Sequence, residues 1–187
     1  MSFLDRIKEC NCHEPGRYRP FRVEGKQVGS VRADMAAALR PYTDVFAVDE
    51  RGVGLSPPLA GFETRTKAVN GVLSRFAGTA IMSRWSGELY GVEPDSGGPA
   101  LFAMERAATP LFGVRAYGVH LNGYVRDQGR ICLWIGRRSR HKSTFPGLLD
   151  NMVAGGLTYG LSPRDCLVKE CEEEAGIPAG QAAQAAA

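Results

Sequence analysis

The stretch that decides the fold is Ser162-Pro163-Arg164-Asp165-Cys166-Leu167-Val168-Lys169-Glu170-Cys171-Glu172-Glu173-Glu174-Ala175-Gly176-Ile177. Ser162 can cap the first turn of a helix, and Pro163 follows at a position where a missing N–H costs nothing. Gly176 is the residue type with which helices commonly stop. The sequence therefore predicts a helix that begins after Ser162 and ends at Gly176.

Three glutamates share one side of this predicted helix. At about 100° per residue, Glu170, Glu173 and Glu174 fall on one arc, and an apolar set falls on another. Carboxylates this close together repel one another unless a positive charge lies among them, and oxygen ligands suit hard divalent cations. A metal site is therefore one interpretation of this cluster, although the run by itself favours the other. The simpler alternative is a solvated acidic helix face, which is the usual role of a run of charges.

The residues before the helix extend the pattern. Gly155-Gly156 and a turn at Gly160 precede it, and the whole resembles the signature of Nudix hydrolases, G-x(5)-E-x(7)-R-E-U-x-E-E-x-G-U, where U is a bulky apolar residue. Every spacing is kept from Gly155 to Ile177. Two positions depart from the signature: Leu161 replaces a Glu, and Lys169 replaces an Arg. Because these two side chains commonly form an ion pair in the family, the two departures are coupled.

A narrower resemblance covers residues 112–178. The run Phe145-Pro-Gly-Leu-Leu-Asp-Asn-Met-Val-Ala-Gly-Gly, continuing through residues 169–178, is similar to the Nudix branch that acts on thiamin diphosphate and its damaged forms, sometimes fused to thiamin pyrophosphokinase. The resemblance implies a Nudix diphosphate hydrolase, which cleaves a phosphoanhydride bond with the help of Mg²⁺ or Mn²⁺. It also implies roles for individual residues: Lys169 orients the carboxylates, and the catalytic, metal-binding set is Glu170, Glu173 and Glu174 with a backbone carbonyl from Ala154-Gly155.

A basic segment lies upstream of this site. Arg137, Arg138 and Lys142 are candidates for binding the anionic oxygens of a substrate phosphate, because guanidinium and ammonium groups suit that task. The equally open alternative is a solvated basic loop.

The expected fold is of the α/β class, a Nudix-type mixed sheet between helices, preceded by a small α+β domain. We place the accessory domain at residues 1–112 and the Nudix domain at residues 113–187, with its signature at 155–177. Helices are expected over 2–10, 33–39 and 64–76, and strands over 18–23, 27–31, 44–49, 51–55, 88–92, 100–104, 116–125 and 130–135, the last two as a hairpin.

Nudix domains normally continue through further strands and a helix, so the sheet is expected to be incomplete at its C-terminal side. A longer protein is the favoured explanation; the alternatives are a layer supplied by another chain, as in a homodimer, or an inactive form.

Length, composition, net charge and cysteine content limit the possible domain organisation, location and partners. With 187 residues, 44% hydrophobic and 23% charged, the chain can form one large or two small domains. No apolar run approaches the ~20 residues of a membrane span, and charges interrupt the first ten residues, so the expectation is a cytoplasmic protein that does not bind membranes. A net charge of +3 is too small to indicate a nucleic-acid partner. The five cysteines are expected to be free thiols, and Cys10-x-Cys12-His13 is only a faint metal pattern.

Four functions stay open from the sequence. The first is a Nudix hydrolase of thiamin diphosphate or related and oxidised diphosphates. The second is a Nudix pyrophosphatase of nucleoside diphosphate derivatives. The third is a degenerate Nudix module that binds a phosphorylated ligand without cleaving it, which Leu161 favours. The fourth is a structural helix with a chance acidic face.

Overall fold

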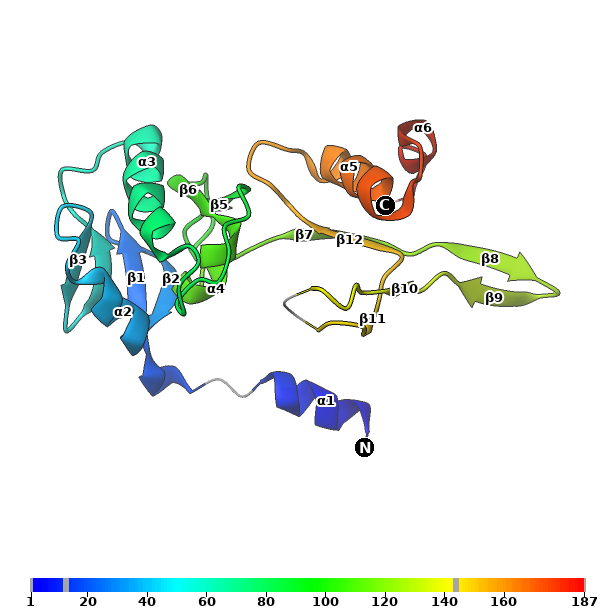
Figure 1. Cartoon of the computed structure of the whole chain (residues 1–187), viewed down its shortest axis with the longest axis horizontal. Coiled ribbons are helices and arrows are strands. Elements are labelled where there is room, and N and C mark those ends of the chain that lie inside the picture. The colour runs from blue at the N-terminus through cyan, green and yellow to red at the C-terminus, as the bar shows by residue number, and fades with distance from the viewer. Residues whose placement is uncertain (1, 12–13, 143–144, 187) are drawn as a thin grey trace. The chain divides into compact units, whose positions relative to one another are not determined.

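The computed structural model describes residues 2–11, 14–142 and 145–186, so Cys12 and His13 of the faint metal pattern lie outside the described residues. The chain divides into two compact units, Met1–Arg115 and Ala116–Ala187 (Figure 1). The sequence placed a boundary after residue 112; the structural units divide after Arg115.

The first unit is built on a four-stranded mixed sheet. Its strands follow the order β2-β1-β4-β3, with β1 antiparallel to β2 and parallel to β4. Their bounds are β1 (Tyr18–Val23), β2 (Lys26–Arg32), β3 (Phe46–Asp49) and β4 (Gly52–Leu55). A separate antiparallel pair consists of β5 (Leu89–Val92) and β6 (Phe102–Glu105).

Helices and short 3-10 turns complete this unit. They are α1 (Phe3–Cys10), η1 (Pro15–Arg17), α2 (Ala33–Leu39), α3 (Phe62–Leu73), η2 (Ser74–Phe76), η3 (Arg106–Ala108) and α4 (Thr109–Phe112). One hydrophobic core of 21 buried residues joins the sheet to α2, α3 and α4. Aromatic rings lie at its centre, since the ring centroids of Phe21 and Phe112 are 5.2 Å apart and those of Phe46 and Phe112 are 6.0 Å apart. The helices and strands expected in this half are all present, with ends shifted by a few residues.

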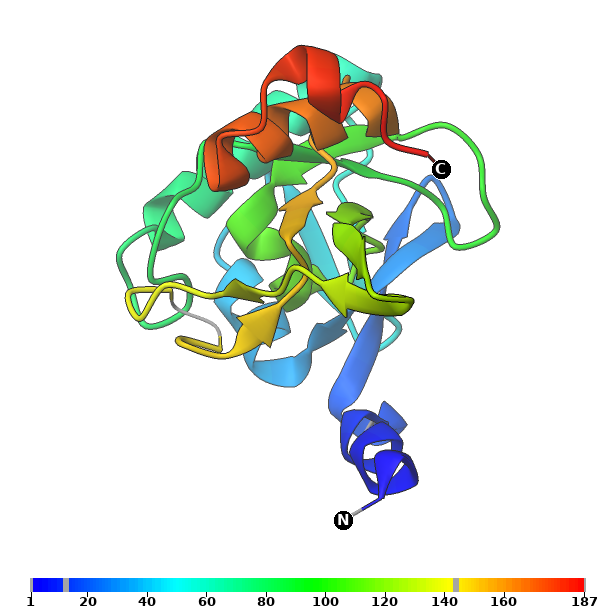
Figure 2. The same ribbon diagram turned by 90° about the vertical axis from the view of Figure 1, so that its right-hand side faces the viewer.

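The strands of the second unit pair two by two, and every pair is antiparallel. The pairs are β7 (Gly118–Leu121) with β12 (Val153–Gly156), β8 (Tyr124–Asp127) with β9 (Arg130–Leu133), and β10 (Gly136–Arg137) with β11 (Leu149–Asp150). Helix α5 (Pro163–Ala175) packs along β12 and is followed by the short helix α6 (Ala179–Ala182) (Figures 1 and 2). The α/β class expected from the sequence is confirmed.

The expected hairpin needs one correction. Its turn is present, because Gln128 and Gly129 both have positive φ, 46° and 78°, as a tight two-residue turn requires. The first strand was predicted to run unbroken over 116–125, and that was wrong. It breaks between β7 and β8 at Gly123, where an added Cβ would lie 2.5 Å from the Met152 sulfur. Consequently β8 pairs with β9 in the hairpin, while β7 pairs with the distant β12.

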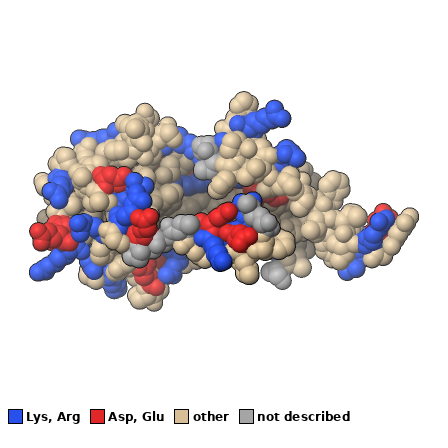
Figure 3. Space-filling view, turned by 90° about the horizontal axis from the view of Figure 1, so that it is seen from below, with Lys and Arg blue, Asp and Glu red and all other residues tan. Residues whose placement is uncertain are grey.

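The charged surface is mixed in sign. On the face that Figure 3 shows, lysine and arginine side chains alternate with acidic ones and leave wide areas of other residues between them. In the part of the chain that the structure describes, no helix combines the length and the apolar character needed to span a membrane.

Candidate functional site

The helix that carries the glutamates is capped at both ends, as its sequence predicts. The Ser162 hydroxyl accepts a hydrogen bond from the Asp165 N–H at 3.1 Å, which satisfies one of the free donors of the first turn. At the other end Gly176 has φ 62°, and its N–H donates to the Glu172 carbonyl at 3.1 Å. These contacts fix where α5 begins and ends.

The apolar side of α5 holds it against the strand β12. Cys166 and Cys171 are fully buried, and Cys171 packs with Val153 of β12 and Ala182 of α6. The Cys166 thiol also donates to the Gly156 carbonyl at 3.4 Å. Burial raises the pKa of the Cys171 thiol, and the neighbouring Glu170 carboxylate raises it further. Both cysteines therefore serve as packing residues.

Glu170 lies in a recess that only a glycine leaves open. Its side chain is largely buried, and a Cβ added to Gly155 would lie 2.1 Å from its carboxyl carbon. No side chain can occupy that space while Glu170 keeps its position. The first glycine of the signature therefore has a steric role here, which is to leave room for the Glu170 carboxylate beside β12.

Glu174 contacts the same strand at Ala154, the residue before Gly155. Its Oε2 atom accepts a hydrogen bond from the Ala154 N–H at 3.1 Å. Glu170 and Glu174 are one helical turn apart, so both carboxylates lie along the 154–155 segment. This is the backbone segment that the resemblance implies as a metal ligand.

Glu173 is engaged by a lysine instead. The Lys169 ammonium lies 2.9 Å from Glu173 Oε2 and 3.4 Å from Glu170 Oε1. The hydrogen bond to Glu173 raises the pKa of Lys169 above its usual value, and the charge of Glu170 adds to the effect. Lys169 thus remains protonated and offsets the charge of two of the three carboxylates. Its role as the residue that orients the carboxylates stays a prediction.

Whether this site fits a divalent ion depends on its donors and on their placement. The donors are all oxygens, which suits Mg²⁺ or Mn²⁺, and the space beside Gly155 admits the buried carboxylate of Glu170. Yet among the described residues no three His, Cys, Asp or Glu side chains are arranged to hold a metal ion. The donor chemistry fits, whereas Glu173 is turned to Lys169. A metal role for the three glutamates stays a prediction.

Glu170, Glu173 and Glu174 form what we call the glutamate face, and a pocket of about 300 Å³ joins one of them, Glu174, to the basic segment. It is lined by Gly136, Arg137, Arg138, Ser139, Lys142, Asp150, Asn151, Met152, Ala154 and Glu174. All three predicted phosphate-binding residues are among them, and Ala154 and Glu174 belong to the predicted metal site. The structure thus brings together two groups that lie up to 37 positions apart in the sequence, Arg137 and Glu174.

The three basic residues of the pocket differ in what they contact. Arg138 pairs with Asp150 at 2.7 Å, and this hydrogen bond lowers the pKa of the Asp150 carboxyl below its usual value. Arg137 donates to the Gly147 carbonyl at 2.9 Å. The Lys142 ammonium forms no ion pair with any residue that the structure describes. Lys142 is therefore the cation most available to an incoming phosphate.

Asp150 and Asn151 are two of the five lining residues of this pocket that were not predicted from the sequence. Asp150 forms the ion pair just described, and Asn151 lies 3.3 Å from the His120 ring and donates to Asn122 at 2.6 Å. These partners come from distant segments. In the sequence they appear only as a polar pair after the basic segment, which does not indicate these contacts.

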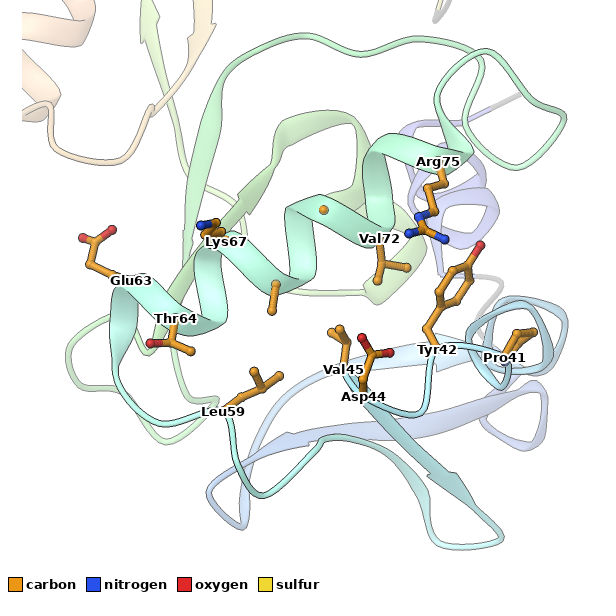
Figure 4. A pocket seen from close by; sticks show the side chains of 12 residues that line it. Pro41, Tyr42, Asp44, Val45, Leu59, Glu63, Thr64, Lys67, Val72 and Arg75 are labelled. Atoms are coloured by element: carbon orange, nitrogen blue, oxygen red, sulfur yellow. The ribbon is translucent and has the colours of Figure 1, made fainter.

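A larger pocket of about 1090 Å³ lies in the first unit, between α3 and the loop before β3 (Figure 4). Val45 and Val72 contribute apolar side chains to it, and the Arg75 guanidinium stacks over the Tyr42 ring at 5.5 Å. Its charged residues are Asp44 from the loop before β3 and Glu63, Lys67 and Arg75 from α3 and η2, and no motif in the sequence indicated a site there.

Comparison with known proteins divides the chain in the same two parts. A family described as a domain of unknown function, DUF4743, matches residues 2–116, and the NUDIX domain matches residues 117–186. Nudix hydrolase 24, chloroplastic, of Arabidopsis thaliana is 44% identical over 179 residues, which are 94% of this chain and 49% of that protein. Nudix hydrolase 20, chloroplastic, of the same plant is 42% identical over 186 residues, 94% of this chain and 50% of that protein. An uncharacterized protein of Saccharomyces cerevisiae is 31% identical over 141 residues, 73% of this chain and 41% of that protein. The chain thus spans about half the length of the plant relatives, or less for the yeast protein.

Proposed function

Since the chain belongs to the DUF4743 family and continues into a Nudix hydrolase domain, we propose that it is a metal-dependent hydrolase that cleaves the phosphoanhydride bond of a small diphosphate. The observation that carries the proposal is the pocket of about 300 Å³, because the basic residues line it together with Glu174, one of the three glutamates, and with Ala154. An anionic diphosphate needs cations that grip its oxygens and a carboxylate site beside the bond that breaks.

Each group of residues has a task in this reaction. Lys142 and Arg137 hold the phosphate oxygens, and the Arg138–Asp150 pair keeps the basic loop folded against its strand. Glu170, Glu173 and Glu174 would hold a divalent ion, which would neutralise the diphosphate and lower the pKa of a water that attacks phosphorus. The water adds to the terminal phosphorus, the P–O bond to the bridging oxygen breaks, and the products are a monophosphate and inorganic phosphate.

For the substrate we propose thiamin diphosphate or one of its oxidised forms. The support is the similarity of residues 145–178 to the branch of the family that acts on such compounds. Nucleoside diphosphate derivatives are the alternative. A panel of both classes, assayed for phosphate release with and without Mg²⁺, separates them: turnover confined to nucleotides would overturn the thiamin assignment.

A second candidate is a Nudix module that binds a phosphorylated ligand without cleaving it. Two observations favour it: Leu161 replaces a signature carboxylate, and the described side chains form no three-ligand metal group. Stabilisation of the protein by thiamin diphosphate without turnover in Mg²⁺ or Mn²⁺ would support this candidate against the hydrolase.

The sharpest test compares two glutamates on the same helix. Glu173→Gln is expected to lower Mg²⁺-dependent phosphate release by more than about 100-fold, because even outer partners of metal ligands cost about 10- to 100-fold when removed. Glu172→Gln is the matched control, since it removes the same charge from an adjacent exposed position and should change the rate little. Circular dichroism should show both variants folded.

Retention of most activity by Glu173→Gln would remove Glu173 from the metal site. The cytoplasmic location and the homodimer are predictions on which the proposed chemistry does not depend.

A further inference from the structure

We propose that Lys169 is a displaceable counter-cation, which neutralises Glu170 and Glu173 while no divalent ion is bound and releases them when the ion arrives. The inference rests on the proposed function, because it takes a divalent ion to bind at these glutamates. It adds that Lys169 lowers the affinity of the site for the ion, and so sets the ion concentration at which the enzyme switches on.

The contacts of Lys169 are those of a bridging cation. Its ammonium lies between two carboxylates of different exposure, at 2.9 Å from Glu173 and 3.4 Å from Glu170. The Glu170 side chain is 11% exposed and held beside Gly155, whereas the Glu173 side chain is 57% exposed. Glu170 is therefore fixed, and Glu173 is the carboxylate that can turn from one cation to another.

A plain surface ion pair is the competing explanation, and it accounts poorly for this arrangement. Lysine four residues before glutamate is the less favourable order for an i,i+4 pair on a helix. Exposed pairs of this kind also contribute little to stability. A lysine whose ammonium contacts two of the three predicted metal ligands is better explained by the charge of those ligands than by support of the helix.

The Lys169 ammonium and a divalent ion cannot occupy the same carboxylates at the same time, for an electrostatic reason. An ammonium and a divalent ion on the same carboxylate oxygens repel each other at short range, so one must leave when the other binds. Lys169 can leave because its side chain is 38% exposed and its stem is flexible. A lysine serves this purpose better than an arginine, whose planar guanidinium grips a carboxylate through two bonds at once.

Binding of Mn²⁺ to the whole chain, without substrate, tests the inference. Free Mn²⁺ is measured by electron paramagnetic resonance for the wild type, Lys169→Met, Lys169→Arg and Lys67→Met. Methionine keeps the length and helix propensity of lysine and removes the charge. Lys67→Met removes a charge from an exposed position on α3, in the other unit, and is the matched control.

Lys169→Met is expected to bind Mn²⁺ about three- to tenfold more tightly than the wild type at low salt, as loss of one repelling charge at short range predicts. The gain should shrink in 0.5 M salt, roughly in step with the shorter screening length. Lys169→Arg and Lys67→Met should bind no more tightly than the wild type. Without Mn²⁺, Lys169→Met should melt at a lower temperature than the wild type, and Mn²⁺ should raise its melting temperature by more.

Equal or weaker Mn²⁺ binding by Lys169→Met would overturn the inference and leave the proposed function in place, because the wild type would still bind the ion. A gain that is also seen with Lys67→Met would overturn it too, since the effect would then be one of net charge. If neither the wild type nor Lys169→Met binds Mn²⁺, the proposed metal-dependent function fails, and the inference fails with it.

Discussion

The two units of this protein differ most in the depth of their cores. The first unit has one cluster of 21 buried residues with aromatic rings in edge-to-face contact at its centre. In the second unit the corresponding cluster contains Val153, Cys171 and Ala182, and every residue of the strands β8 and β9 is exposed. The proposed chemistry therefore lies on the unit with the thinner core.

This difference shows how the glutamate face is held. A large core positions side chains through many packing contacts. With a small core, the positions of side chains depend on a few local features. Here those features are the Ser162 cap, the recess at Gly155 and the hydrogen bond from the Ala154 N–H to Glu174. Changes to single residues in the second unit should thus affect the site, and changes in the first should affect stability.

The largest effect is expected from the first core. Phe112→Ala removes a fully buried ring and should lower the free energy of unfolding of the first unit by about 3–5 kcal/mol. Val153→Ala, in the second core, should lower that of its own unit by about 1–3 kcal/mol. The chain has two tryptophans, Trp85 in the first unit and Trp134 in the second. Urea unfolding followed in Trp134→Phe and Trp85→Phe backgrounds therefore reports on each unit separately.

The comparison of the cores predicts that the Trp134 transition occurs at lower urea than the Trp85 transition. It also predicts that each core substitution shifts the transition of its own unit. Coincident transitions in every variant would break the comparison, because the two cores would then unfold as one.

A smaller effect is expected at the Gly155 recess. Gly155→Ala places a methyl group where the Glu170 carboxylate lies, so Glu170 must move away from β12. Mn²⁺ affinity should fall by about tenfold or more, a loss comparable to that of removing a partner of a metal ligand. Gly180→Ala is the control within the same unit, since an added Cβ there meets nothing within 4 Å. Titration calorimetry with Mn²⁺ measures both, and equal affinities would show that Glu170 is not a ligand.

The smallest effect concerns acid stability. Arg138 lowers the pKa of Asp150 in the folded state, so this pair stabilises the second unit above the usual carboxyl pKa of 3.8. That stabilisation is lost as the pH falls through the lower, folded value. Arg138→Met should therefore be less stable than the wild type at pH 6, and the difference should vanish at acid pH.

Urea midpoints of the Trp134 transition between pH 6 and pH 2.5 test this expectation. Arg137→Met is the control, because the guanidinium of Arg137 donates to a carbonyl whose charge does not change with pH. A stability difference for Arg138→Met that stays constant with pH would show that the pair with Asp150 does not carry the effect.

Much of the local structure could be predicted from the residues alone. The helix from Pro163 to Ala175 has local causes at both ends: the Ser162 side chain accepts from a backbone N–H of the first turn, and Gly176 readily adopts the positive φ that ends the helix. The turn at Gln128-Gly129 is local in the same sense, since positive φ at both positions suits a tight hairpin. The glutamate arc likewise follows from helical geometry, and the family resemblance from spacing along the chain.

What the sequence by itself determined is thus the elements, their ends and the chemistry of the donors. Only the tertiary structure decided that β7 pairs with β12 across more than 30 residues, that Gly155 makes room for Glu170, and that Lys142 lines one pocket with Glu174. The reason is physical: capping, turns and helical faces depend on neighbours within about four positions. Strand pairing, recesses and charge partners depend instead on which distant segments pack together, and that depends on the burial of the whole chain.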